Sequence, residues 1–200
     1  MFLVEFGFDI RFADSRLGGS ECQIHSTSTN VLRQVSGAKI KIVTGYPGTN
    51  DIRLALERGE IDGVCESFSS IKATKPDWLE QKKINIIVQF SFQGHPELPG
   101  VPPIGSYAGS PTQADALRLI FSSAETGRPF GAPPAIPSDR LNALRRAFDA
   151  TMKDPEFVEL TTKAKFDVDP STGEQTAGFL ERAYRSPQAA VDAARKLLEQ

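Results

Sequence analysis

Apolar and polar positions along the first half of the chain alternate in blocks that predict strands and helices in turn. The opening residues predict a strand because apolar side chains occupy every second position, at Phe2, Val4, Phe6 and Phe8. Three further runs rich in aliphatic residues predict strands over 39–43, 61–65 and 83–90. Capping residues and closing glycines predict helices over about 20–36 and 52–58, and another from residue 66. This alternation predicts an α/β fold whose parallel or mixed sheet is covered by helices on both faces.

The second half of the chain has helical spacing almost throughout. Helices are predicted from Pro111, from Ser138, after an Asp154 cap with Pro155 in the first helical position, and over 172–185 and 187–199. The proline-rich segment 128–137 is predicted to be extended, and residues 166–170 are predicted to be a short strand or edge segment.

Composition and charge exclude several classes of function. The 200 residues carry a formal net charge of −2, and no more than two Lys or Arg residues occur in a row. We therefore expect neither nucleic acid nor an anionic membrane as a partner. No apolar run approaches the roughly 20 residues of a membrane-spanning helix. The apolar start contains Glu5 and Asp9 and has no basic segment, so it does not have the pattern of an export leader and, as written, indicates a cytoplasmic protein.

Residues that could carry catalysis or bind a metal are sparse. Cys22, Cys65, His25 and His95 lack the spacing of a local metal site, so we expect no metal and interpret the cysteines as buried thiols. A disulfide remains an alternative for an exported protein. The sequence contains no nucleophile elbow, dinucleotide-binding, phosphate-binding-loop or HExxH motif. We therefore expect no cofactor and no enzymatic activity, with a small α/β enzyme of unrecognised class as the alternative.

Three ordered pairs of segments carry a recognisable pattern. Residues 45–51 and 54–63 contain a glycine turn, a short helix and a Gly-x-hydrophobic-Asp strand. Residues 83–89 and 95–102 contain a strand and a proline-rich loop, and residues 130–141 and 147–157 contain an extended crossover, a capped helix and an Asp-Pro-Glu helix. In this order the segments resemble the Bug-type solute-binding receptors of bacterial tripartite tricarboxylate transporters.

The resemblance implies a two-lobed Venus-flytrap protein of the type II periplasmic binding-protein class. Such a protein captures a small carboxylate or polar solute and presents it to the subunits of a membrane permease. The implied organisation is an unplaced segment 1–17, an α/β ligand-binding lobe 18–129, and a segment 130–200 that holds the crossover and the C-terminal helices of the other lobe. The resemblance also implies a periplasmic location and an earlier half-lobe that this chain does not contain, so we expect a truncated receptor.

Ligand-binding residues are expected where helix N-termini follow the carboxyl ends of strands, because free backbone N–H groups and the helix dipole favour a carboxylate there. The candidates are Gly19, Ser20, Tyr46, Gly48, Thr49, Asn50, Glu66 and Ser67. Turns and caps use the same residue types, so Ser20 is also a candidate N-cap and Gly48 with Thr49 a candidate turn and cap. Glu66 would repel a carboxylate, which indicates either a different polar solute or an outward-facing side chain.

A chain that lacks a half-lobe would expose the apolar faces of its C-terminal helices. The side chains concerned are Leu141, Leu144, Phe148, Phe157 and Leu160. An exposed apolar surface of that size promotes association between molecules. The alternative to a working receptor is therefore a remnant that binds no solute and self-associates.

Overall fold

The structure, a computed structural model, describes residues 2–6, 15–20, 23–122, 126–127, 129–164, 166 and 168–199, with side chains from residue 27 onward. The chain divides into two compact units. Unit 1 comprises residues 1–124 and 186–200, and unit 2 comprises residues 125–185. None of the helices in the described ranges has the length and apolar character needed to cross a membrane.

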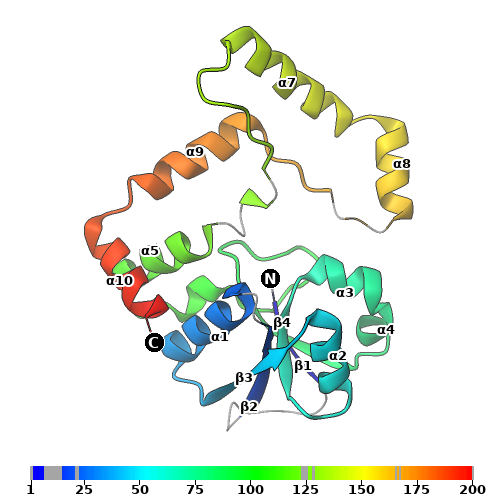
Figure 1. Ribbon diagram of the computed structural model, residues 1–200, viewed down its shortest axis with the longest axis vertical. Coiled ribbons are helices and arrows are strands. Elements are labelled where there is room, and N and C mark those ends of the chain that lie inside the picture. Colours follow the sequence, from blue (N-terminus) through cyan, green and yellow to red (C-terminus); the bar gives the residue numbers. More distant parts are fainter. Residues whose placement is uncertain are drawn as a thin grey trace. The chain divides into compact units, whose positions relative to one another are not determined.

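Unit 1 is built on a mixed sheet with the strand order β3-β2-β4-β1-β5 (Figure 1). The strands are β1 (Phe2–Phe6), β2 (Ser15–Ser20), β3 (Ile40–Tyr46), β4 (Gly63–Glu66) and β5 (Ile84–Gln89). Strand β2 runs parallel to β3 and β4, whereas β1 runs antiparallel to β4 and β5. The predicted α/β class with a parallel or mixed sheet is confirmed, and the mixed arrangement is the one observed.

Strand β1 confirms the strand predicted from alternating apolar residues, although Phe8 lies outside the described residues. In the segment 1–17, which the sequence left unplaced, the described residues are 2–6 in β1 and 15–17 in β2. β1 lies inside the sheet, between β4 and β5, and β2 begins at Ser15. The opening residues therefore belong to the same unit as the strands that follow them, because pairing on both sides of β1 satisfies its backbone hydrogen bonds.

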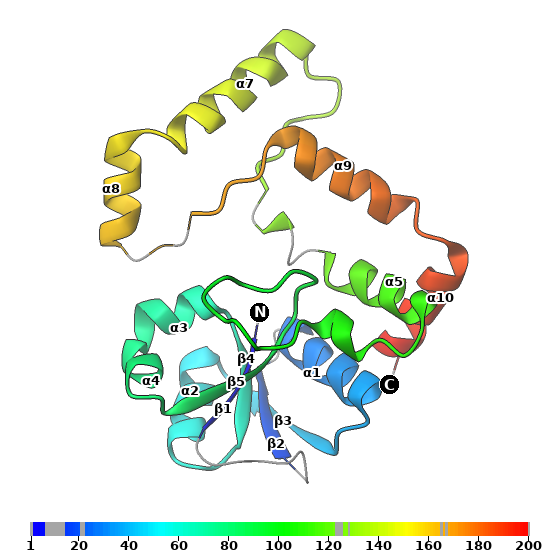
Figure 2. The ribbon, with the colours of Figure 1, turned by 180° about the vertical axis from the view of Figure 1, so that it is seen from behind.

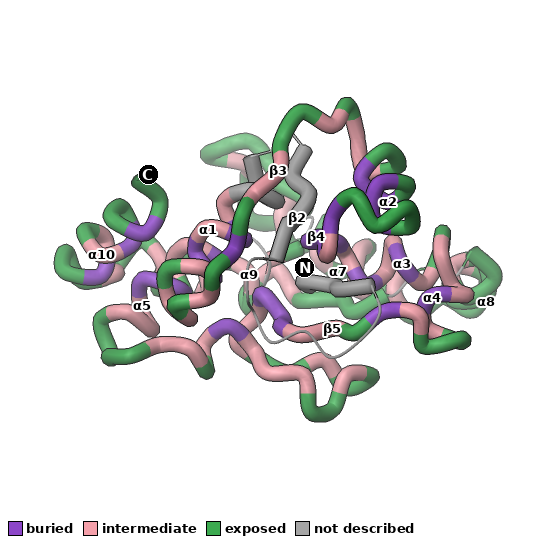
Figure 3. The backbone as a smooth tube through the Cα atoms, turned by 90° about the horizontal axis from the view of Figure 1, so that it is seen from below, coloured by how far each residue is buried: buried purple, intermediate pink, exposed green. Residues whose placement is uncertain are grey.

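Helices cover both faces of the sheet, and each face has its own apolar cluster (Figures 2 and 3). One cluster joins the sheet to α1 (Gln23–Ser36), α5 (Pro111–Ile120) and α10 (Gln188–Leu198), with Leu32, Phe90 and Leu117 fully buried. The other joins it to α2 (Thr49–Glu57), α3 (Phe68–Thr74) and α4 (Pro76–Glu80). Trp78 belongs to this second cluster and is buried there as a packing residue.

Helix α10 returns the chain to unit 1 after unit 2 is complete. Its buried residues Ala190, Ala194 and Leu197 face α5 and α1, and Gln34 Nε2 donates a hydrogen bond to the Leu197 carbonyl at 2.9 Å. The predicted division assigned all of 130–200 to the other lobe. The structure differs for residues 186–200, because the apolar face of α10 completes the first cluster of unit 1.

Unit 2 contains α7 (Ser138–Thr151), α8 (Pro155–Lys163) and α9 (Gly173–Tyr184), and none of these helices has a buried residue. The predicted Asp154 cap of α8 is confirmed, since its side chain accepts a hydrogen bond from Phe157 N. The predicted strand at 166–170 is wrong: the described residues of this segment have no regular secondary structure. Its backbone groups therefore have no strand partner there.

Glu57 links α2 to α4 through two donors. Its Oε1 accepts from Lys75 Nζ at 2.6 Å and from the indole Nε1 of Trp78 at 3.1 Å. The Lys75 hydrogen bond is the main cause that holds the pKa of the Glu57 carboxyl below its ordinary value. A lowered folded-state pKa stabilises the protein above the ordinary carboxyl pKa, and this stabilisation is lost as the pH falls through the folded-state value.

We therefore expect Glu57→Gln to flatten the acid limb of the stability profile. Below about pH 4.5 the free energy of unfolding should fall less steeply in the variant than in the wild type, because one ionised carboxylate no longer has to be protonated. Trp78 is the single tryptophan, so its fluorescence reports urea unfolding of unit 1. Asp77, whose pKa is lowered by Lys83, remains in both proteins and serves as the internal reference. If the free energy of unfolding fell equally steeply with decreasing pH in both proteins, the role of Glu57 in acid stability would be contradicted.

Candidate functional site

The carboxyl ends of four strands meet at one edge of the sheet in unit 1. β2, β3 and β4 are parallel and end at Ser20, Tyr46 and Glu66. β5 also ends there, at Gln89, because β1 is antiparallel to both β4 and β5. Helices α1, α2 and α3 begin just after β2, β3 and β4 respectively. Their N-termini therefore lie at this edge, where α/β proteins commonly bind ligands.

The loop between β2 and α1 differs from its predicted form. Gly19 and Ser20 are the last residues of β2, and Ser20 pairs with Tyr46 across the sheet. The predicted N-cap role of Ser20 is wrong, since α1 begins only at Gln23. Both residues lie at the carboxyl edge, and their side-chain environment lies outside the described part of the structure.

The loop between β3 and α2 leaves backbone donors available. Tyr46 is the last residue of β3, and Gly48 is the N-cap of α2, with an extended backbone and no side-chain cap. Thr49 is the first helical residue, so the alternative in which its side chain caps the helix is not observed. The Gly48 carbonyl accepts from Asp51 N and Ile52 N. Within the described ranges, the backbone N–H groups of Thr49 and Asn50 donate to no acceptor.

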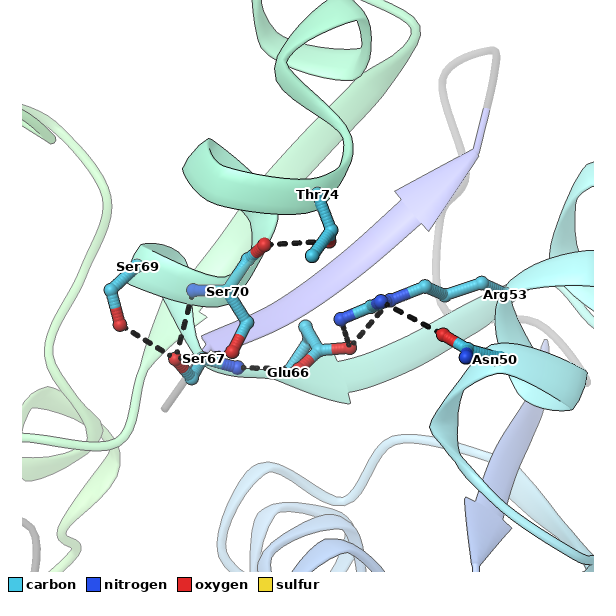
Figure 4. Close-up of polar contacts among 7 residues, drawn as sticks. All are labelled: Asn50, Arg53, Glu66, Ser67, Ser69, Ser70 and Thr74. Carbon is cyan, nitrogen blue, oxygen red and sulfur yellow. Dashed lines mark hydrogen bonds and ion pairs between the residues drawn. The ribbon is translucent and has the colours of Figure 1, made fainter. Parts of the chain in front are cut away.

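Glu66 ends β4 and forms a buried ion pair with Arg53 of α2 (Figure 4). Arg53 Nε donates to Glu66 Oε2 at 3.0 Å, and Nη2 lies 2.9 Å from the same oxygen. Arg53 Nη1 donates to Asn50 Oδ1 at 3.2 Å, while Glu66 Oε1 accepts from Ser67 N at 3.2 Å. The relative exposure is 8% for Arg53 and 4% for Glu66. These contacts join the first turn of α2 to the β4–α3 junction.

A cluster of hydroxyl groups surrounds the start of α3. Ser67 is the N-cap, and its Oγ accepts from Ser70 N at 3.2 Å. The same Oγ lies 2.9 Å from Ser69 Oγ and donates to Ser70 Oγ, so its side-chain partners in these contacts are neutral hydroxyl groups. Ser67 and Ser69 are each partly exposed. The cluster therefore places neutral hydroxyl groups at the start of α3, and Figure 4 shows it joined to Asn50 of α2 through Glu66 and Arg53.

The predicted candidates are thus brought together in part. Asn50, Glu66 and Ser67 belong to one hydrogen-bonded group, and Gly48 and Thr49 lie at its α2 side. The alternative of an outward-facing Glu66 side chain is wrong, because its carboxylate is buried in an ion pair with Arg53. Sequence reasoning missed Arg53, and the signal for it is an arginine one turn after Asn50 on a helix face that otherwise carries buried apolar residues.

Gln89, at the end of β5, organises the loop over residues 91–103. This side chain is fully buried; its Nε2 donates to Val101 O at 2.7 Å, and its Oε1 accepts from His95 N at 2.8 Å. The ring of His95 packs edge-on against Phe68, with ring centroids 5.3 Å apart. The loop is therefore held beside α3 at the carboxyl edge.

Replacing Gln89 with leucine should loosen this loop. The change leaves His95 N–H and Val101 C=O without their side-chain partner, at a cost of about 1–3 kcal/mol for each group that stays buried. Urea unfolding would measure the loss, and amide hydrogen exchange at His95 should accelerate. Gln113→Leu is the matched control, because Gln113 also binds a backbone group but lies at the surface. If Gln89→Leu and Gln113→Leu lowered the free energy of unfolding equally, the buried hydrogen bonds of Gln89 would have no special role in holding the loop.

The remaining chemistry-bearing residues form no second centre in the described part of the chain. Cys65 is a buried free thiol, and burial raises its pKa, so the thiolate is disfavoured. Cys22 and His25 were considered as metal or catalytic residues, and their side chains lie outside the described residues. Where side chains are described, no three His, Cys, Asp or Glu residues gather as metal ligands would.

Solved structures with the same fold as this chain include two solute-binding or ligand-bound proteins. One is R. palustris Rpa4515 with adipate, with a TM-score of 0.56 and 15% sequence identity over 97% of this chain. The other is a TctC solute-binding protein from Polaromonas without ligand, with a TM-score of 0.62 and 12% identity over 97% of this chain. This chain spans 64% of the length of each. No family model matches the chain, and no curated protein matches it in sequence.

The structural matches confirm the fold expected from the resemblance. The chain has the periplasmic binding-protein fold found in TctC-type solute receptors. The sequence identities of 15% and 12% are too low for a shared fold to indicate a shared ligand, so function has to be argued from the site itself.

Proposed function

We propose that this chain binds a small carboxylate-bearing solute at the carboxyl edge of the sheet in unit 1. The observation that carries the proposal is the α2 N-terminus, where the N–H groups of Thr49 and Asn50 donate to no acceptor in the described ranges and Ser67 and Ser69 lie nearby across the Arg53–Glu66 pair. Backbone N–H groups and the positive end of the helix dipole suit an oxyanion. Neutral hydroxyls add hydrogen bonds without a counter-charge.

We further propose that the solute is held between this edge and a second lobe, as in a Venus flytrap. The chain would then be part of a periplasmic receptor that presents its solute to the permease of a tripartite tricarboxylate-type transporter. Support comes from the shared fold, from the adipate named with one neighbour, and from the ordered sequence segments over residues 45–157. Gly19, Ser20 and Tyr46 would line the same half-site from β2 and β3.

Titration with dicarboxylates tests the proposal directly. Adipate and homologues of different chain length would be added to the ¹⁵N-labelled chain while amide chemical shifts are recorded. We expect saturable shifts at Thr49, Asn50 and Ser69, with smaller shifts at Lys82 and Lys83 beyond α4. NMR detects millimolar affinities, which matters because one lobe supplies only part of the contacts in a receptor of this class. Absence of saturable shifts with every carboxylate would reject the proposal.

Unit 2 supports a second candidate role, self-association. Several large apolar side chains there are exposed, among them Leu144, Leu160, Phe166 and Tyr184. Exposed apolar surface favours contact with another copy of the chain. Size-exclusion chromatography with light scattering would show a concentration-dependent mass above 21.8 kDa if this role is correct. Leu144→Ser with Leu160→Ser should reduce that mass, and a monomer at every concentration would reject self-association.

A further inference from the structure

The Arg53–Glu66 pair places two opposite charges at the proposed site, and both are removed from water. Arg and Glu side chains are rarely buried to this extent without a partner. Here each is the partner of the other, with Glu66 Oε2 within 3.0 Å of two guanidinium nitrogens. The net charge of the pair is zero, so its field falls off more steeply than that of either ion alone.

The pair is directly connected to both groups of proposed donors. Arg53 Nη1 donates a hydrogen bond to Asn50 Oδ1. The backbone N–H of Asn50 is one of the proposed donors at the α2 N-terminus. Glu66 accepts from the backbone N–H of Ser67, the residue whose hydroxyl contacts Ser69. A net charge on either partner would therefore act on a ligand at short range and through a region that excludes water.

We propose that the Arg53–Glu66 pair sets the charge selectivity of this site. Glu66 without Arg53 would repel a carboxylate, and Arg53 without Glu66 would attract anions of any shape. With the two charges cancelled, neutral donors recognise the carboxylate by the geometry of their hydrogen bonds. The inference rests on the proposed function, and it makes Arg53 and Glu66 positioning and selectivity residues that act without binding the ligand themselves.

The experiment compares adipate with adipamide, its neutral diamide, in the wild-type chain and in variants. Glu66→Gln keeps an acceptor for Arg53 but leaves the guanidinium charge uncancelled. It should tighten adipate binding roughly ten-fold at low ionic strength, with little change for adipamide, and added salt should reverse the gain. Because added charge acts only on a charged ligand, the ratio of the two dissociation constants separates selectivity from a general loss of structure.

Two further variants complete the design. Glu57→Gln is the matched control, since it removes the same charge from the other end of α2, about 12 Å along the helix. At low ionic strength this distance is not fully screened, but Glu57 is partly exposed to water, so the change in the ratio should be much smaller than in Glu66→Gln. Arg53→Gln with Glu66→Gln removes both charges and should return the ratio to the wild-type value whatever its absolute affinity. If Glu66→Gln alone does not fold, Arg53→Gln takes its place as the test: the uncancelled Glu66 carboxylate should weaken adipate binding roughly ten-fold with little change for adipamide.

The outcomes distinguish this inference from the proposed function. If the wild type binds neither adipate nor any other carboxylate, both are rejected. If the wild type binds adipate but Glu66→Gln changes both ligands equally or neither, the selectivity inference alone is rejected. An equal change in the Glu57→Gln control would also reject it, because net charge of the lobe would then explain the effect.

Discussion

Replacing Arg53 with alanine is expected to lower the free energy of unfolding by about 3–5 kcal/mol. The substitution leaves Glu66 charged and buried at 4% exposure, with its Oε2 deprived of both guanidinium contacts. Glu66→Ala should cost a similar amount, since it leaves the Arg53 cation unpaired. Urea denaturation followed by the fluorescence of Trp78, which lies in the same unit, measures each loss.

The double variant decides how much of this cost belongs to the pair. Arg53→Met with Glu66→Leu removes both charges and keeps apolar volume, so it should recover most of the stability lost in either single variant. Buried ion pairs often can be exchanged for apolar residues at little cost, whereas a single unpaired charge cannot. If the losses in the single variants simply add in the double variant, the two residues act independently and the pair contributes no coupling.

Leucine-to-alanine substitution at position 197 should destabilise unit 1 by about 2–5 kcal/mol. Leu197 is 9% exposed and belongs to the cluster that contains residues of α1, α5 and β5. Removing its side chain leaves a cavity under α10, and the transition reported by Trp78 should shift to lower urea concentration. The effect should appear at Trp78 even though about 120 residues separate the two positions, because both lie in unit 1.

Leu198→Ala is the control for this prediction. It removes the same atoms from the adjacent position, where the side chain is 51% exposed. Surface substitutions of this kind usually change stability by less than about 0.5 kcal/mol. The packing of α10 on unit 1 would be contradicted by equal losses of stability at the two positions. It would also be contradicted if Leu197→Ala left the unfolding transition reported by Trp78 unchanged.

Local signals predicted most of the elements of unit 1 but not how they combine. Alternating apolar residues identified β1, and the β-branched run at 83–90 identified β5. The same residues do not encode which strand lies beside which, so the position of β1 between β4 and β5 appeared only in the structure. A helix was predicted to begin at about residue 20, yet Ser20 pairs with Tyr46 as the last residue of β2, after a register shift at Gly19.

The candidate site shows the same limit. Ser67 could be predicted at a helix start, and the structure confirms it as the N-cap of α3. The apolar helix face around Arg53 indicates that its side chain is buried, but it does not identify the partner Glu66, which lies 13 residues further along the chain in another element. Burial of both charges depends on the contact between α2 and β4, which no local pattern specifies. The charge at this edge of the sheet could therefore not be judged from Glu66 alone.

The return of α10 to unit 1 has a consequence for how the protein is made. A ribosome releases residues 125–185 before it releases the helix that supplies Ala190, Ala194 and Leu197. During synthesis at about 5–20 residues per second, the apolar surfaces of the nascent α1 and α5 therefore stay uncovered for several seconds. Chaperone binding to the emerging chain should concentrate in this interval and end when residue 198 has cleared the exit tunnel.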